Sequence, residues 1–179
     1  MNISAMSEFL STDSIKLHMA YLKTLRLRLS IIKKSLSNDL ENYEDVLRMK
    51  LDAKLKEEVI YLLWQIQSHE IFFDSFSCER AKIDLKNTPY GSSEGLLYEL
   101  YRLGVNREGG FLYVSVDRGG QISVCHVSRP DRYFMLNPPR LCIDLSEHTY
   151  FSDYHFEKDR FLKNALNNLD LGRLKAELT

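Results

Sequence analysis

The stretch FLYVSVDRGGQISVCHV, residues 111–127, decides the fold class of this chain. Two runs rich in β-branched and aromatic residues flank the turn sequence DRGG, a pattern typical of a β-hairpin. After the Pro138-Pro139 pair, RLCIDL (140–145) predicts a third strand. The second half of the chain is therefore expected to contain an antiparallel sheet of three strands.

The residues before this hairpin predict two long helices. After the N-cap candidates STD (11–13), apolar residues recur at steps of mostly three and four, which predicts an amphipathic helix over about 14–37. The polar segment 37–45 interrupts this pattern, and a second helical pattern runs from about Leu55 to Phe76. Two long helices joined in this way predict an antiparallel helical hairpin.

Helices and strands are thus segregated along the chain. A short helix closed by Gly104 is predicted for EGLLYELYRLG, and the residues from about Glu147 to the end are helical in pattern again. Such an order is typical of an α+β protein. We predict a helical hairpin domain, residues 1–80, and an α+β domain, residues 81–179, whose three-stranded antiparallel sheet is surrounded by helices.

Composition excludes several classes of protein. Hydrophobic residues make up 44% of the chain and charged residues 27%, and the formal charge of −1 argues against a nucleic-acid partner held by overall cationic attraction. Charges interrupt every long apolar run and residues 1–10 lack a signal-peptide pattern, so we expect a cytoplasmic protein with no membrane partner. The odd cysteines, without a C-x-x-C pair, indicate neither a disulfide framework nor a thiolate zinc site.

Two histidines occupy the apolar faces of the predicted long helices. His18 follows Ile15 by three residues, and His69 follows Ile66 by three and precedes Phe73 by four. Taken singly, each is more often a hydrogen-bonded core histidine than a ligand.

A polar pair, Asp144 and His148, lies four residues apart after the last predicted strand. Asp144 or Ser146 could instead simply cap a helix that carries His148. Together, the three imidazoles and the carboxylate form a ligand set that suits iron, manganese or zinc. The other histidines, His126 and His155, are interpreted as structural or solvated.

Three motifs that contain these residues resemble those of the iron/manganese superoxide dismutase family. STDSIKLH (11–18) is similar to its S-x-E-T-[IL]-x-[FY]-H, QIQSHEIFF (65–73) to Q-V-W-N-H-x-F-[YW], and DLSEHTYFSDY (144–154) to D-V-W-E-H-A-Y-Y-x-D-Y. EGGFLYVSVDRGGQIS (108–123) also resembles the family's G-S-G-W-x-W-L and the strand that follows it. The resemblance extends from about Phe9 to the C-terminus.

The resemblance implies a mononuclear metal site between the two domains. Its ligands would be His18, His69, Asp144 and His148, with one iron or manganese ion per chain and superoxide as the substrate. Gln65 falls where iron-type members carry a glutamine that hydrogen-bonds solvent at the metal, so iron is preferred. Manganese-type members supply that group from the loop after the second strand, which here contains Arg129 and Pro130.

Glu147 matches the family's glutamate that reaches across a dimer to the partner's histidine ligand, so a homodimer is expected. For attraction of the anionic substrate, the candidates are Arg26 and Lys158; a solvated surface charge is the alternative for both. On the resemblance, Gln65 and Arg26 are the predicted catalytic residues.

Several positions depart from the family pattern. The histidine one turn after the first ligand is Leu22 here, the gateway tyrosine is Arg26, and the tyrosine that bridges the subunits is Phe151. Two tryptophans that narrow the family's pocket correspond to Ser146 and Phe111. A rival register would place Tyr21 on the gateway tyrosine and move the first ligand to Asp13.

Three functions remain open at this point. A divergent superoxide dismutase of reduced or altered activity explains the complete ligand set. A non-catalytic scaffold or assembly protein with the same fold explains the missing tyrosine and histidines. A metalloenzyme of another redox reaction would use the pocket that the missing tryptophans enlarge.

Overall fold

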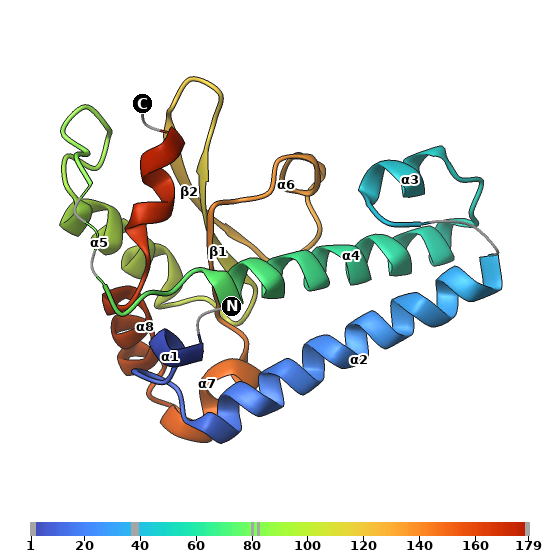
Figure 1. Cartoon of the computed structure of the whole chain (residues 1–179), viewed down its shortest axis with the longest axis horizontal. Coiled ribbons are helices and arrows are strands. Elements are labelled where there is room, and N and C mark those ends of the chain that lie inside the picture. The colour runs from blue at the N-terminus through green and yellow to red at the C-terminus, as the bar shows by residue number, and fades with distance from the viewer. Residues whose placement is uncertain (1–2, 37–39, 80, 82, 178–179) are drawn as a thin grey trace.

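The computed structural model describes residues 3–36, 40–79, 81 and 83–177. Two long helices, α2 (Thr12–Leu36) and α4 (Ala53–Asp74), lie side by side as an antiparallel hairpin (Figure 1). The sheet lies at one end of this hairpin, and the connection between the two long helices lies at the other. This arrangement confirms the predicted fold class, an α+β protein with a helical first half. The predicted domain boundary between residues 80 and 81 stays a prediction.

The connection between the two long helices is partly helical. The polar pattern predicts no helix there, but α3 (Tyr43–Arg48) forms within it. A capping box explains this helix, because the side chain of Asn42 accepts from the backbone of Asp45 while the Asp45 carboxylate accepts from the backbone of Asn42. Six residues are too few for an apolar period to reveal.

The sheet contains the three predicted strands, β1 (Phe111–Val116), β2 (Ile122–Val127) and β3 (Leu141–Asp144). Both neighbours of the central strand β1 are antiparallel to it, in the order β2-β1-β3. Asp117 closes the β1–β2 turn, since its carboxylate accepts from the backbone of Gly119 and Gln121.

Helix α5 (Ser93–Gly104) is present as predicted and begins after Ser92, whose side chain accepts from the backbone of Gly95, but Gly104 does not cap its end. The capping position is Val105, and Gly104 is a buried helical residue. A Cβ atom at Gly104 would lie 2.7 Å from Leu112 Cδ1 and 3.1 Å from Leu162 Cδ2. This glycine therefore permits α5 to pack closely against β1 (Phe111–Val116) and α8 (Lys158–Asn167).

The C-terminal residues are helical, as predicted. They form α7 (Glu147–Tyr154), α8 (Lys158–Asn167) and the 3₁₀ helix η1 (Leu171–Glu177). Two short helices that the sequence pattern does not predict, α1 (Ile3–Met6) and α6 (Arg132–Leu136), complete the described structure.

Hairpin and sheet share one apolar core. Helix α4 packs on β3, and α2 packs on α7, so the two halves of the chain meet at the base of the hairpin. A buried polar cluster joins them: Tyr113 Oη accepts from Trp64 Nε1 at 2.8 Å and lies 2.5 Å from Ser68 Oγ.

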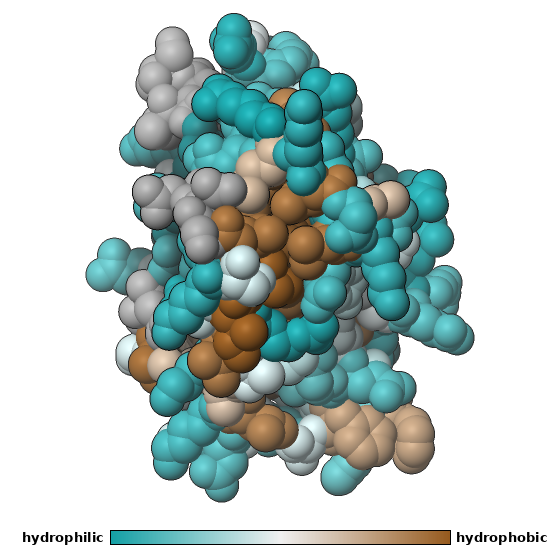
Figure 2. Space-filling view, turned by 90° about the vertical axis from the view of Figure 1, so that its right-hand side faces the viewer, coloured by the Kyte–Doolittle hydropathy of each residue, from teal (hydrophilic) through white to brown (hydrophobic). Residues whose placement is uncertain are grey.

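The opposite end of the hairpin carries apolar surface. Figure 2 faces this side of the molecule and shows a band of hydrophobic residues bordered by hydrophilic ones. Ile31 on α2 and Leu47 on α3 are exposed apolar residues of the chain. Within the described ranges, no helix is both long and apolar enough to cross a membrane.

Candidate metal site

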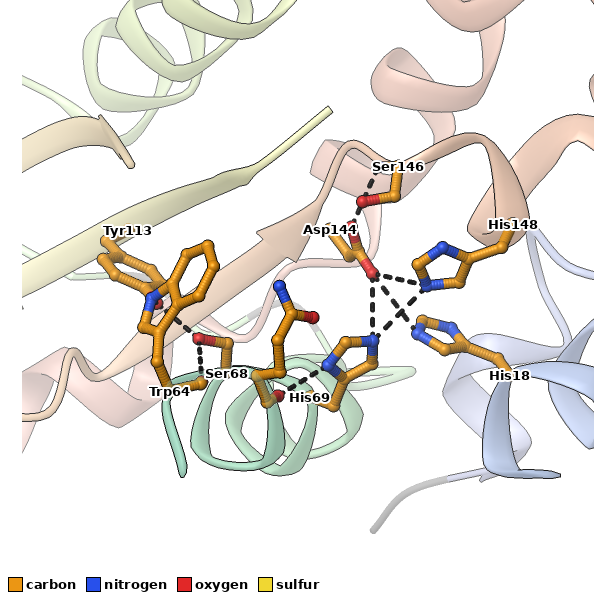
Figure 3. Close-up of polar contacts among 9 residues, drawn as sticks. His18, Trp64, Ser68, His69, Tyr113, Asp144, Ser146 and His148 are labelled. Carbon is orange, nitrogen blue, oxygen red and sulfur yellow. Dashed lines mark hydrogen bonds and ion pairs between the residues drawn. The ribbon is translucent and has the colours of Figure 1, made fainter. Parts of the chain in front are cut away.

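Four side chains from both halves of the chain converge at the base of the hairpin (Figure 3). His18 comes from α2, His69 from α4, Asp144 from the end of β3 and His148 from the first turn of α7. Their potential ligand atoms all lie within 4.8 Å of one another. The structure thus brings together the four residues that the sequence predicts as ligands.

Local structure explains why each side chain points inward. His18 lies on the buried stripe of α2 with Ile15 and Leu22, and His69 lies on the buried face of α4. Asp144 pairs with Phe111 on the central strand, which places it in the interior at the end of the sheet. Because α7 begins at once after β3, His148 returns to the same point.

The contacts within this cluster are not ordinary hydrogen bonds. Asp144 Oδ2 lies 3.3 Å from Nε2 of His18, 3.4 Å from Nε2 of His69 and 3.2 Å from Nε2 of His148. Charge-assisted hydrogen bonds are shorter, about 2.7–2.9 Å. Among the described atoms, Asp144 Oδ2 and both ring nitrogens of His18 are buried and have no hydrogen-bond partner. Buried polar atoms without a partner are costly, so this arrangement requires a further explanation.

A bound cation would supply that explanation. Imidazole nitrogens and carboxylate oxygens lie about 2.0–2.2 Å from a divalent ion, so neighbouring ligand atoms are about 3.3–3.6 Å apart at roughly tetrahedral angles. The observed separations from Asp144 Oδ2, 3.2–3.4 Å, are close to this range. Nitrogen and carboxylate donors suit zinc, iron or manganese. The residues present therefore fit a mononuclear metal ion.

Backbone groups hold two of these side chains in place. His69 Nδ1 donates to the carbonyl oxygen of Gln65, 2.6 Å away, because a carbonyl can only accept. The backbone N–H of Ser146 donates to Asp144 Oδ1 at 2.9 Å. These bonds leave His69 Nε2 and Asp144 Oδ2 directed at the centre of the cluster, as is typical of metal ligands.

Burial and charge set the protonation states of the cluster. Burial lowers the pKa of His69 to about 4, although the carboxylate of Asp144 opposes the shift. Burial raises the pKa of Asp144, but its contacts with His148 and His18 outweigh that effect and hold the pKa well below its usual range. A neutral imidazole and an ionised carboxylate are the forms that bind metals.

Aromatic rings enclose the cluster. Phe111 lies edge-on to His69 with ring centroids 5.4 Å apart, and Tyr21 lies 5.3 Å from the ring of His69 and 4.5 Å from that of His148. Sequence reasoning placed Tyr21 at the site only in the rival register. Asp13, the ligand of that register, is almost fully exposed and contacts Lys16, so the structure favours the register with His18.

Among the four side chains of the cluster, His148 is the one that reaches the surface. His18, His69 and Asp144 are buried, whereas the side chain of His148 is 32% exposed. A cavity of about 600 Å³ lies against His148 and is lined by residues of α7, of the loop after α5 and by Lys158. Glu147 also lines this cavity.

Other predicted residues lie at the edge of the site or apart from it. Gln65 is buried one turn before His69 on α4. Arg26 is not in the cluster; its guanidinium contacts Glu70 Oε1 at 2.6 Å on the outside of the hairpin. Lys158 is partly buried, and its ammonium donates to the carbonyl of Arg107.

The remaining departures also have clear places. Leu22 is a core residue, and the side chain of Phe151 is partly exposed on α7. His126 donates from Nε2 to the carbonyl of Gly109 at 2.8 Å, as expected of a structural histidine. His155 is exposed and ends α7 with a φ of 50°.

Comparison with known proteins matches the second half of the chain to one family model. Residues 81–177, a little more than half of the chain, match "Iron/manganese superoxide dismutases, C-terminal domain". A separate comparison with individual curated proteins gives no match.

Proposed function

The chain belongs to the iron/manganese superoxide dismutase family, and from this premise we propose that it is a divergent dismutase, which converts superoxide to dioxygen and hydrogen peroxide. Its reaction centre would be a single metal ion held by His18, His69, Asp144 and His148. The observation that carries the proposal is the convergence of these four side chains around one point, with buried nitrogen and oxygen atoms that lack other partners.

Iron or manganese bound there supplies the one-electron redox couple that dismutation requires, and iron is the preferred ion because Gln65 is present on α4. The chain's own residues hold and shield the ion. His69 is oriented by the Gln65 carbonyl and Asp144 by the Ser146 N–H. Tyr21 and Phe111 cover the imidazole of His69 and exclude water from that side.

Access for a small anion is proposed from the side of His148, the partly exposed ligand. The adjoining cavity contains Lys158, whose positive charge would attract superoxide. Arg26 contributes less in this proposal, since its charge is balanced by Glu70.

The active form is proposed to be a cytoplasmic homodimer. Glu147 is the first residue of α7 and directly precedes His148. Both residues line the cavity beside the site. A carboxylate from a partner subunit at this position would orient an imidazole ligand. The free cysteines Cys78, Cys125 and Cys142 agree with a reducing compartment.

A second candidate function is a non-catalytic scaffold of the same fold. The observation that favours it is the loss of polar groups around the site: Leu22 is a core residue, Arg26 pairs with Glu70, and Phe151 cannot donate or accept a hydrogen bond. A protein used only as a scaffold has no physical need for four polar side chains in one core, which opposes this alternative.

Metal analysis of the purified, untagged protein separates the two functions. Inductively coupled plasma mass spectrometry should find about one iron or manganese ion per chain in the wild type, because the site has one set of ligands. His69→Ala should lose the metal and the capacity to consume superoxide. His155→Asn is the matched control, since it removes an exposed histidine and keeps a residue that tolerates positive φ.

A wild-type protein without metal, even after refolding with each ion, would favour the scaffold. One metal ion per chain without consumption of superoxide would support the metal site and refute the dismutase reaction.

A further inference from the structure

Helix α2 carries a second apolar row on the side that faces away from the core. Its members alternate at steps of three and four residues: Leu17, Ala20, Thr24, Leu27 and Ile31. All five are exposed, and the large ones are 55% (Leu17), 59% (Leu27) and 60% (Ile31) exposed. A helix that is apolar on both sides is usually covered on both sides. We call this row the outer seam.

The spacing of the outer seam is that of a coiled coil. Alternating steps of three and four correspond to the a and d positions of a heptad repeat, here over two heptads. Such a seam is narrower than the apolar face of a helix that lies on a globular core. Lys34 occupies the next position after Ile31 in this repeat and ends the apolar row.

The charged residues that α2 itself places along the edges of the outer seam are basic. Helix α2 contains six basic residues and one acidic residue, Asp13, whose carboxylate lies 3.7 Å from Lys16 Nζ. Lys16 and Lys23 occupy the g positions along one edge of the seam, and Arg28, paired with Glu58, lies on the other edge. Within the described part of the chain, Lys23 has no ion pair.

We propose that the outer seam of α2 is a docking site for an amphipathic helix of another protein, with an apolar a/d row flanked by glutamate or aspartate. Acidic residues at the flanks would pair with Lys16 and Lys23 and set the partner's register.

The same charges disfavour two other occupants. Two copies of the seam would place basic edges against each other in either orientation, which is destabilising. A lipid surface is contacted by helices with a broad face of Trp, Phe and Leu, whereas this seam is narrow and includes Ala20 and Thr24.

A designed peptide of about three heptads tests the proposal on the full chain. The probe has leucine at a and d and glutamate at e and g, and its fluorescence anisotropy reports binding. A second peptide with lysine at e and g is the charge control. We expect the wild type to bind the glutamate peptide at least about tenfold more tightly, and the difference to shrink with added salt.

Two double variants locate the binding. Leu27→Gln with Ile31→Gln should weaken binding of the glutamate peptide by about tenfold or more. Tyr98→Gln should have no effect on this binding, because Tyr98 is similarly exposed but lies on α5. Lys16→Glu with Lys23→Glu should reverse the preference to the lysine peptide; Lys86→Glu is its control.

Four outcomes would overturn the proposal. They are equal binding of both peptides, binding that Leu27→Gln with Ile31→Gln leaves unchanged, binding to anionic vesicles in place of the peptide, and a dimer in light scattering that this double variant dissociates.

Discussion

At the scale of single residues, two clusters of buried polar atoms differ in how completely their hydrogen bonds are satisfied. Asp144 belongs to the first cluster: its Oδ1 accepts from a backbone N–H, while its Oδ2 faces three imidazoles without a hydrogen bond. Trp64, Ser68 and Tyr113 form a second buried cluster, in which each polar side-chain group has a partner. In the first cluster Asp144 Oδ2 has no hydrogen-bond partner among the described atoms, whereas the second cluster is complete.

Tyr113→Phe should therefore destabilise the protein. It leaves the buried Trp64 Nε1–H without an acceptor, a loss of about 1–3 kcal/mol in the free energy of unfolding. Urea unfolding followed by the fluorescence of Trp64, the single tryptophan, measures it. Tyr98→Phe on the surface should change nothing. Equal stability of the two variants would show that Tyr113 Oη is dispensable.

Gly104→Ala should also be destabilising, through overpacking. The new Cβ would meet Leu112 and Leu162, which are themselves buried, and such strain typically costs about 1–3 kcal/mol. Gly119→Ala in the β1–β2 turn is the control, because its nearest neighbour is the flexible end of Asp117. Thermal unfolding compares them; an unchanged midpoint for Gly104→Ala would refute the packing role.

At the scale of elements, α4 links the helical hairpin to the sheet. It carries His69, packs on β3 and contributes Trp64 to the junction with the sheet. Its start is defined by Asp52, whose side chain accepts from the backbone of Leu55 at 3.0 Å. Helix α7 differs, since its first flanking residue Ser146 makes no side-chain cap bond.

Asp52→Ala should lower the free energy of unfolding by about 1 kcal/mol, the usual value of an N-cap side chain. Ser146→Ala, at the equivalent position of α7, should cost much less because no cap bond is lost. Chemical denaturation of both variants checks the difference. A larger effect of Ser146→Ala would mean that its side chain acts on Asp144 or on the site.

At the scale of the whole molecule, the site lies where the two halves of the chain meet, and it opens on one cavity beside His148. If this face joins two subunits, as we propose, the partner would close the only partly exposed ligand. Metal binding and assembly should then depend on each other.

Glu147→Ala tests this coupling. Light scattering should give twice the chain mass of 20.9 kDa for the wild type and a weaker dimer for the variant. Its metal affinity should fall by about 10–100-fold, as on loss of a group that orients a ligand. Glu157→Ala, an exposed residue paired with Arg160, should preserve both properties. A wild type that stays monomeric at high concentration would exclude the dimer.

The main elements follow from local sequence patterns, and the structure confirms them. Apolar periods of 3.6 mark α2 and α4, and two β-rich runs around DRGG mark the β-hairpin, because each pattern reflects only residues close in the chain. The sequence pattern does not predict the short helices α1, α3 and α6, because each is shorter than the window of residues in which an apolar period can be recognised.

The residues of the candidate site likewise divide into those that the sequence predicts and those that only the tertiary structure reveals. Inward positions of His18 and His69 follow from helical spacing, and Asp144 and His148 stand out by their spacing of four residues after the last strand. The family resemblance implied that all four are ligands. Only the packing of distant elements could place Tyr21 against two of these imidazoles, pair Arg26 with Glu70, and assign Gly104 to close packing instead of a helix end. Helix and strand formation depends on neighbours in the chain, whereas contacts between elements depend on how those elements pack.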